Sequence, residues 1–533
     1  MDNYFVSSCK RVKDWICRQF GQKEKKTVHH KKFADGGEVI VWETGRAGEE
    51  AASYENLFLR KEIAGFRTNI RREQSCSIKS LTRDYLYKQL LSSGEYTFDH
   101  MLVIKDPYGE APLTALALFI LEEPACVRVT TKGNLKETDF VTELPKKKEH
   151  RVPILGMYAE KANDIVIEIL DDEGNCVKSH TFTIRTKRLP KSLRNVITVK
   201  KWTDKPAYSN IMINGGVKIH TCVFDIEGKI RYYLSRKPRG YGIFPLSDGH
   251  FFYMEKYISV PSYSNPQTVE SYDMDYFGRV FRTYLTEKGV HHTAEEKAGG
   301  NILTGSNSML EHTEDCVIEI DRQTGEIVWQ LNMAEIFDET YQNMMDWCHV
   351  NSAAYYEKDR TILISLRNVH AVICVDYDTK KLRWILSDPK FWEGTKMTPY
   401  LLQPEGDVKW CYQQHAAFEI ALPDESNPQK KRIIVYDNHW AKRRKAKSFD
   451  KDPLSYVSFY DIDEEKKTVS LHKRFAGPKT RIRANGIYVP DKKRVYNMAG
   501  SYAEPVDGDG GGIFEYDYAV SYTHLRAHET LSD

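Results

Sequence analysis

The residues with the clearest chemical potential lie between positions 346 and 415. Asp346-Trp347-Cys348-His349-Val350-Asn351-Ser352 is followed by Arg367 and later by Gln414-His415. The planar guanidinium of Arg367 can bind two oxygens of a tetrahedral oxyanion at once. His349 and Asn351 can donate further hydrogen bonds. A neutral His415, with an ordinary histidine pKa of ~6.5, can act as a nucleophile or a base. These side chains suit a small tetrahedral anion with a histidine aimed at its central atom.

A repeated hairpin pattern shows how the chain could position these residues. From about residue 195, an apolar strand ending in Asp, a short turn and a second strand recur, most clearly at Ile318–Trp329 and Cys374–Trp384. Asp and Gly suit such turns, so each copy predicts a β-hairpin. The spacing is near 50 residues except for one gap of 85, and the Asp positions are Asp225, Asp275, Asp321, Asp376, Asp461 and Asp517. Six hairpins at this period predict a six-bladed β-propeller.

A second repeat places the chemistry at one end of the predicted propeller. Three segments that precede apolar strands align with one another, namely His292-Thr293-Ala294, Ser352-Ala353-Ala354 and His415-Ala416-Ala417. We therefore expect His292, Ser352 and His415 at the starts of the innermost strands of successive blades. Because such starts line one mouth of the central channel, their side chains can meet in space. His292 would then be a further donor to the anion.

The N-terminal third has a different pattern. Residues 1–95 form an extension that is partly helical, with a helix predicted at Leu81–Leu91. Residues 96–190 contain apolar β-rich runs such as Ala115–Leu121, which predict a small β-sandwich packed on the propeller. The propeller then occupies residues 195–518, so the expected fold class is all-β. Residues 520–530 match a translated transposase sequencing adapter. We therefore expect 519–533 to be an artefact and the last blade to be truncated before its outer strand.

Composition excludes some partners and compartments. The chain has Lys+Arg 77 and Asp+Glu 75, a net charge of +2, so no overall field favours nucleic acid. Its 10 cysteines form no CxxC pair or zinc-like spacing, and Cys316 and Cys374 are expected to be small buried residues. Lys10, Arg11, Lys13 and Arg18 interrupt any apolar run near the start, so neither an export signal nor a membrane segment is expected. The cytoplasm is the expected location, or the periplasm if the N-terminus is mis-assembled.

The motif set resembles the bacterial arylsulfate sulfotransferase family. The resemblance rests on Asp-Trp-x-His-x-Asn-Ser, Arg367 eighteen residues after His349, the earlier His-His pair and the later Gln-His. It extends over roughly residues 95–518, with family-like segments at 138–141 and 149–158. The resemblance implies a six-bladed propeller behind an N-terminal β-sandwich. It also implies transfer of a sulfuryl group from an aryl sulfate to a phenol, without the nucleotide sulfate donor PAPS, a metal or another cofactor.

The resemblance also implies residue roles. His415 matches the histidine that becomes transiently sulfated, and the residues matching those that bind the sulfuryl oxygens are His349, Asn351 and Arg367. His292, or less favourably His291, matches a histidine from the preceding blade, and Thr480 is a weak match to a last hydroxyl donor. The chain departs from exported members in lacking a cysteine in residues 375–410, where those members have a disulfide before the nucleophile. Ping-pong kinetics and a sulfohistidine are expected.

Two alternatives stay open from the sequence. The first is a metal-dependent hydrolase or lyase that uses His292, His349 and His415 as ligands. Asn351 and Arg367 are poor neighbours for a cation, which disfavours this alternative. The second is a non-catalytic propeller that serves as a binding platform. The expected partners are a small aryl sulfate donor and a phenol acceptor, with no nucleic acid and no membrane, and a homodimer is left open. Trp347, Tyr412 and Phe418 would either line the phenol site or belong to the core.

Overall fold

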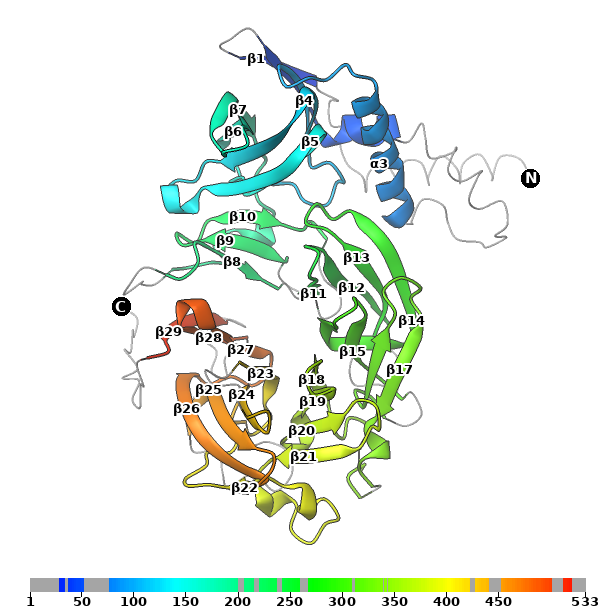
Figure 1. Cartoon of the computed structure of the whole chain (residues 1–533), viewed down its shortest axis with the longest axis vertical. Helices are drawn as coiled ribbons and strands as arrows, with labels where there is room; N and C mark the ends of the chain where they lie inside the picture. Colours follow the sequence, from blue (N-terminus) through cyan, green and yellow to red (C-terminus); the bar gives the residue numbers. More distant parts are fainter. Residues whose placement is uncertain are drawn as a thin grey trace, which may run out of the picture.

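The structure is a computed structural model of the whole chain. It describes residues 28–33, 37–51, 76–199, 206–214, 220–236, 242–258, 267–308, 312–338, 340–342, 344–421, 427–440, 452–500 and 511–519. All but the first residue of the expected artefact (519–533) and most of the N-terminal extension lie outside these ranges. Strands dominate the described residues, and Figure 1 shows an upper domain above a ring of sheets. No helix among the described residues is long and apolar enough to cross a membrane.

The upper domain is one bent sheet with a helix against it. Its strands are β1 (Val28–Lys32), β2 (Glu38–Trp42), β3 (His100–Lys105), β4 (Ala115–Thr131), β5 (Phe140–Ile154), β6 (Ala162–Leu170) and β7 (Cys176–Arg185). The long strand β4 pairs with β5 along its length, while its other edge pairs first with β3 and then with β6. Strands β1 and β2 continue the sheet, with β2 parallel to β3.

Helix α3 (Cys76–Ser92) confirms the predicted helix and extends it at both ends. Its buried residues Leu86, Tyr87 and Leu91 pack into one cluster with Leu102 and Ile104 of β3. Burial of these large side chains removes apolar surface from water, which is the main stabilisation available to a short surface helix.

Five sheets form the ring below this domain. They are, in chain order, β8 (Asn210–Ile213), β9 (Cys222–Asp225) and β10 (Ile230–Tyr233); β11 (Gly242–Pro245), β12 (Phe251–Ile258), β13 (Gln267–Met274), β14 (Val280–Glu296), β15 (Ile302–Ser306), β16 (Cys316–Ile320) and β17 (Ile327–Asn332); β18 (Val350–Tyr356), β19 (Thr361–Leu366), β20 (Ala371–Asp376) and β21 (Leu382–Leu386); β22 (Gln403–Pro404), β23 (His415–Ile420), β24 (Lys430–Asp437), β25 (Leu454–Asp463) and β26 (Thr468–Pro478); and β27 (Ala484–Val489), β28 (Arg494–Ala499) and β29 (Gly512–Asp517).

Figure 1 shows these sheets following one another around the ring, from β8–β10 beside the upper domain to β27–β29. The predicted propeller is therefore confirmed. In the seven-stranded sheet, β14 pairs with β13 through its first part and with β15 through its last part. Dividing that sheet at β14 gives six units among the described residues. The number of complete blades stays a prediction.

The predicted hairpin turns are formed by the residues that the pattern singled out. Asp225 accepts hydrogen bonds from the backbone N–H groups of Glu227 (3.0 Å) and Lys229 (2.9 Å). Gly228 has a positive φ of 76°, which a residue with a side chain adopts only at a cost. This turn joins β9 to β10, which confirms the physical argument behind the repeat.

Candidate active site

The strand order brings the predicted site residues to one end of the ring. His292 lies on β14, His349 directly precedes β18, and His415 is the first residue of β23. Strand β18 packs against β14, β15 and β23, so these strands are neighbours around the channel. Arg367 begins a short 3-10 helix (Arg367–Val369) directly after β19, where β19 pairs with the start of β18. The structure thus brings His292, His349, Arg367 and His415 near one another.

The backbone is irregular beside each of these histidines, at the starts of β18 and β23 and in the last part of β14. The pairing register shifts between His291 and Ala294 on β14, between Val350 and Ser352 on β18, and between His415 and Ala417 on β23. Positive φ values accompany the shifts, at 58° for His292, 57° for His349 and 49° for Ala416. Such bulges re-aim side chains and are frequent beside functional sites. Here they turn histidines of β-strands toward the channel mouth.

His349 is held as a cation by two carboxylates. Its Nδ1 lies 2.6 Å from Oε2 of Glu314 and 3.0 Å from both carboxylate oxygens of Asp346. Burial alone would favour the neutral ring, but Glu314 and Asp346 outweigh it and raise the pKa of His349 to about 9. In the same way, burial would raise the pKa of Glu314, but His349 holds it well below its usual range. At neutral pH, His349 can therefore donate from Nε2 to an anionic oxygen.

His292 is neutral, in contrast to the His349 cation, and its tautomer is defined by its neighbour His291. His291 is fully buried, and its Nε2 donates to the carbonyl oxygen of Ser306 at 2.8 Å. Its Nδ1 is consequently an acceptor, and it lies 3.1 Å from Nδ1 of His292, which must donate. Burial, helped by the nearby His349 cation, holds the pKa of His292 well below its ordinary value. His292 is thus neutral with an unprotonated Nε2, and its ring packs edge-to-face on that of His349 at 4.8 Å.

His415 is also neutral, and its tautomer is defined by Asn438. Nδ1 of His415 lies 2.6 Å from Oδ1 of Asn438, an oxygen that can only accept, so Nδ1 carries the proton. Nε2 then carries the lone pair, and the backbone N–H of Arg483 donates to it at 3.4 Å. Burial and the positive charge of Arg367 lower the pKa of His415 to about 3. The imidazole is therefore unprotonated on Nε2 throughout the physiological range.

Thr480 supports this arrangement from behind. It is fully buried, and its hydroxyl accepts from Nδ2 of Asn438 at 2.9 Å while lying 3.1 Å from the hydroxyl of Ser455. The role of Thr480 as a hydroxyl donor to the anion stays a prediction. In this structure its hydroxyl contacts Asn438 and Ser455 and lies 3.3 Å from the hydroxyl of Tyr436.

Arg367 and Asn351 complete the anion-binding set. The guanidinium of Arg367 donates to the neutral oxygens of Asn368 (3.3 Å), Gln413 (3.2 Å) and the Arg481 backbone (3.4 Å). Asn351 is 6% exposed, and its Nδ2 donates to the backbone oxygen of Gln414 at 2.8 Å. Since an amide nitrogen has two protons, a second donor is left for a ligand. His415 follows Gln414 directly, so Asn351 also links β18 to the strand that begins at His415.

The structure corrects one placement and completes the site with residues that the patterns missed. His415 pairs with Tyr436 at the end of β24, and the residue that pairs with the equivalent position of β19, Leu366, is Val350. The counterpart of His415 on β18 is therefore Val350 and not Ser352. The Ser352 hydroxyl instead accepts from the backbone N–H of Ala417.

Trp347 is fully buried in an apolar cluster, and Cys316 and Cys374 are buried as predicted. Glu314 and Asn438 were missed. The sequence did contain a signal for Asn438: an asparagine follows the strand both in Arg367-Asn368 and in Asp437-Asn438.

Metal-ligand types gather here in a set different from the predicted one. Among the described residues, the groups whose ligand atoms lie within 4.8 Å of one another are His291, His292 and Glu314, and Glu314, Asp346 and His349. His415 belongs to neither group, so the three-histidine ligand set is wrong. Within these groups, Nδ1 of His349 lies 2.6 Å from Oε2 of Glu314 and 3.0 Å from Oδ1 of Asp346, and Nδ1 of His292 lies 3.1 Å from Nδ1 of His291.

Comparisons with solved structures find distant likenesses. An auxiliary nutrient binding protein from Bacteroides ovatus is 10% identical with a TM-score of 0.36, covering 72% of this chain and 91% of that one. The β-propeller domain of Cps50 (Swd1) from Myceliophteria thermophila is 12% identical with a TM-score of 0.30, covering 75% and 98%. These likenesses are too low to carry a functional argument.

Sequence comparisons are more specific. The arylsulfate sulfotransferase AssT of Lelliottia amnigena is 21% identical over 564 residues, covering 81% of this chain and 90% of the relative. AssT of Escherichia coli O6:H1 is 22% identical over 493 residues, covering 69% and 78%. The family model for the arylsulfotransferase (ASST) matches residues 195–510, and that for the arylsulfotransferase Ig-like domain matches residues 102–187. The chain therefore belongs to the arylsulfotransferase family and is an aryl-sulfate sulfotransferase.

Proposed function

We propose that the enzyme moves a sulfuryl group from an aryl sulfate to a phenol by a ping-pong mechanism through a sulfated His415. One observation carries the proposal: three neighbouring histidines are held in two protonation states. His349 is a cation, whereas His415 and His292 are both neutral, with Nδ1 protonated and Nε2 unprotonated. A nucleophile, an anion donor and a base are the groups that a two-step transfer requires.

In the first step, Nε2 of His415 attacks the sulfur of the aryl sulfate. The N–S bond forms as the S–O bond to the aryl group breaks, and the electron pair leaves with the phenolate. Phenol, with a pKa of ~10, is a tolerable leaving group. Arg367, His349 and the amide of Asn351 can donate to the three sulfuryl oxygens. Fixed donors of this kind stabilise charge that spreads over the oxygens during transfer. A sulfate monoester carries one negative charge, so these donors need no metal.

In the second step, the oxygen of an acceptor phenol attacks the same sulfur. The N–S bond breaks and its electron pair returns to Nε2 of His415, while the phenol proton passes to Nε2 of His292. Nε2 is the nitrogen of His292 that can accept, because Nδ1 already donates to His291. Its lowered pKa means that the proton is held only transiently and passes on to the departing phenolate or to solvent. The role differs from the one expected from the sequence, in which His292 donates to the anion.

Rapid mixing with 4-nitrophenyl sulfate tests the mechanism. Without an acceptor, one equivalent of 4-nitrophenol per site is expected as a burst, with the sulfuryl group retained on His415. His415→Ala is expected to abolish the burst and to lower turnover with phenol by about 10³-fold or more. Initial rates at several acceptor concentrations are expected to give parallel double-reciprocal lines. An intact burst in His415→Ala, or a wild type with neither burst nor label, contradicts the proposal.

The second candidate function is a metal-dependent hydrolase whose ligands differ from the three histidines expected from the sequence. It is favoured by the convergence of His291, His292, His349, Asp346 and Glu314 within two overlapping groups. Elemental analysis of the purified protein separates the two. Activity that disappears with a chelator and returns with one equivalent of zinc, iron or manganese favours the metal mechanism. Unchanged burst kinetics after chelation favour sulfohistidine. The cytoplasmic location and the homodimer stay predictions.

A further inference from the structure

The nucleophile is positioned by a side chain to which the sequence assigned no role. Oδ1 of Asn438 lies 2.6 Å from Nδ1 of His415, and Asn438 is fully buried. An amide can turn its oxygen or its nitrogen toward a neighbour, so the amide's orientation acts together with the Arg483 backbone N–H, which donates to Nε2 at 3.4 Å, on which nitrogen of His415 holds the proton. What determines that orientation is therefore the central question.

The hydroxyl of Thr480 determines it. Nδ2 of Asn438 donates to Oγ1 of Thr480 at 2.9 Å, and Thr480 lies 3.1 Å from the hydroxyl of Ser455, which also accepts from the Thr480 backbone N–H at 2.8 Å. A flipped amide would place a carbonyl oxygen against Thr480 and an N–H₂ group against Nδ1 of His415. In that orientation Nε2 would carry the proton and could not attack sulfur.

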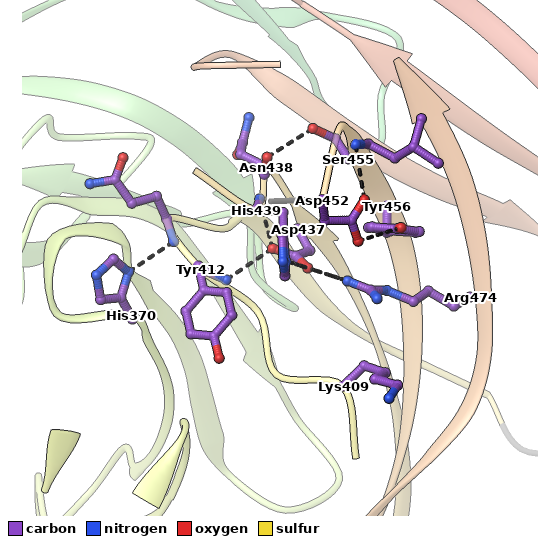
Figure 2. Close-up of polar contacts among 12 residues, drawn as sticks. His370, Lys409, Tyr412, Asp437, Asn438, His439, Asp452, Ser455, Tyr456 and Arg474 are labelled. Atoms are coloured by element: carbon purple, nitrogen blue, oxygen red, sulfur yellow. Dashed lines mark hydrogen bonds and ion pairs between the residues drawn. The ribbon is translucent and has the colours of Figure 1, made fainter. Parts of the chain in front are cut away.

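The backbone on both sides of Asn438 is held as well, as Figure 2 shows. The backbone oxygen of Asn438 accepts from the Ser455 hydroxyl at 2.8 Å. The preceding residue, Asp437, is fully buried and accepts from the backbone N–H groups of Tyr412 (2.9 Å) and His439 (2.8 Å) and from Arg474 (2.7 Å). Arg474 is itself held over the ring of Tyr456 at 3.3 Å. Hydrogen bonds at Asp437 and at the Asn438 carbonyl thus fix the backbone from which the Asn438 side chain extends.

A neutral acceptor also suits the chemistry. When Nε2 takes up a sulfuryl group with Nδ1 still protonated, the ring becomes a cation, which makes it a better leaving group in the second step. The carbonyl of Asn438 stabilises the Nδ1–H of that cation without adding a negative charge. A carboxylate at the same place would instead favour protonation of the resting imidazole and lose the free Nε2.

We propose that Asn438 is a positioning residue that holds His415 in its Nδ1–H tautomer and so selects Nε2 as the nucleophile. The inference rests on the proposed function in that His415 must be the sulfated residue. The other repeats also have an asparagine at the corresponding position: Asn307 follows β15, and Asn368 lies two residues after β19. An asparagine at this position therefore also has an explanation in the fold alone. The amide oxygens of Asn307 and Asn368, however, accept from the Glu314 backbone (2.8 Å) and Arg367 (3.3 Å) and not from an imidazole.

Long-range ¹H–¹⁵N NMR of histidine-labelled protein tests the tautomer directly, without relying on turnover. Wild type is expected to show Nδ1–H and a bare Nε2 for His415, a signal assigned by its loss in His415→Ala. Asn438→Leu is expected to give the other tautomer or a mixture of the two. The burst rate and kcat should then fall roughly 10²-fold or more, as happens when a catalytic histidine loses the partner that sets its tautomer. The donor KM is expected to change little.

Asn438→Asp and Thr480→Val keep the test informative if Asn438→Leu fails to fold. Asn438→Asp keeps an acceptor at Nδ1, so the Nδ1–H tautomer should persist while the acid limb of the pH–rate profile moves upward. Thr480→Val should give a mixed tautomer, because the amide can then turn. Asn497→Leu is the matched control: Asn497 is equally buried, and no hydrogen bond to His415 is described for it. It should leave tautomer and pH profile unchanged.

The outcomes separate this inference from the proposed mechanism. If wild type forms sulfohistidine while Asn438→Leu keeps both the tautomer and the burst rate, Asn438 is not a positioning residue. If wild type forms no sulfohistidine but the tautomer still follows Asn438, the geometry stands and the proposed mechanism fails. Equal shifts in Asn438→Leu and Asn497→Leu would mean general loosening of the fold, which overturns the inference.

Discussion

Oε2 of Glu314 lies 2.6 Å from Nδ1 of His349, although 35 residues and a sheet boundary separate them in the chain. Glu314 is fully buried. A buried carboxylate is costly unless it is paired, and an isolated buried imidazole prefers to be neutral. Each charge is therefore maintained by the other, and the result is a histidine that is a cation at neutral pH.

Glu314→Gln is expected to move the basic limb of the pH–rate profile downward. If His349 must be protonated, wild-type activity is lost as pH rises through its pKa of about 9. Removing the Glu314 charge leaves burial and only Asp346 to act on the ring, so the limb should shift by about one unit or more. Turnover at pH 8 should then fall while turnover at pH 6 is largely kept. Steady-state rates between pH 5.5 and 10 measure this shift.

Glu335→Gln serves as its control, because Glu335 lies at an exposed position before the site and does not contact His349. Its profile should match wild type. A Glu314→Gln enzyme with an unchanged basic limb would show that His349 is not the group titrating there.

His415 should make the protein less stable in acid. Its pKa is lowered to about 3 in the folded state, whereas the unfolded chain titrates near ~6.5. Between these values the unfolded state binds the proton and the folded state does not, so the free energy of unfolding falls as pH drops from about 6.5 toward 3. His415→Gln removes this titration. Its stability relative to wild type should rise by roughly 2 kcal/mol between pH 7.5 and pH 4.5 in urea denaturation. A constant difference across that range contradicts the depressed pKa.

Arg367→Lys should not rescue the loss of Arg367. A lysine keeps the charge but has no planar fork for two oxygens, and it cannot hold Gln413 and the Arg481 carbonyl together. We expect kcat/KM for 4-nitrophenyl sulfate to fall roughly 10²-fold in Arg367→Lys and further in Arg367→Met. Stopped-flow burst rates should fall in the same order. Wild-type kinetics in Arg367→Lys would mean that Arg367 acts only through its charge.

Arg231→Met should loosen the join between the two domains. Arg231, on β10, is fully buried and donates to the Gly156 and Thr138 carbonyls (both 2.6 Å), with its guanidinium 4.1 Å from the ring of Tyr158. Removing it leaves buried carbonyls without their donor, at a cost of roughly 3 kcal/mol. Thermal unfolding measures the loss. Arg128→Met, which breaks a partly exposed contact with Glu143, is the control and should change little.

The predicted propeller came from residues whose effect is local. Asp and Gly specify hairpin turns within a few residues, and alternating apolar runs specify strands, so a 50-residue period was visible without any long-range information. The resemblance to arylsulfotransferases named His292, His349, Asn351, Arg367 and His415, and the fold brings them to one mouth. The two-residue error at Ser352 has a local cause too, because the irregular backbone at this part of β18 and β23 leaves no mark in the residue types.

The states of the three histidines could not be read from the sequence. Their identities were visible, but protonation depends on which charges and oxygens lie within a few ångströms, and those come from other strands. Glu314 makes His349 a cation, His291 leaves Nε2 of His292 unprotonated, and Asn438 does the same for His415. The sequence alone determined the fold class and the side chains that meet; the tertiary structure decided which of them donates, accepts or attacks, because electrostatic and hydrogen-bond energies depend on distance in space and not along the chain.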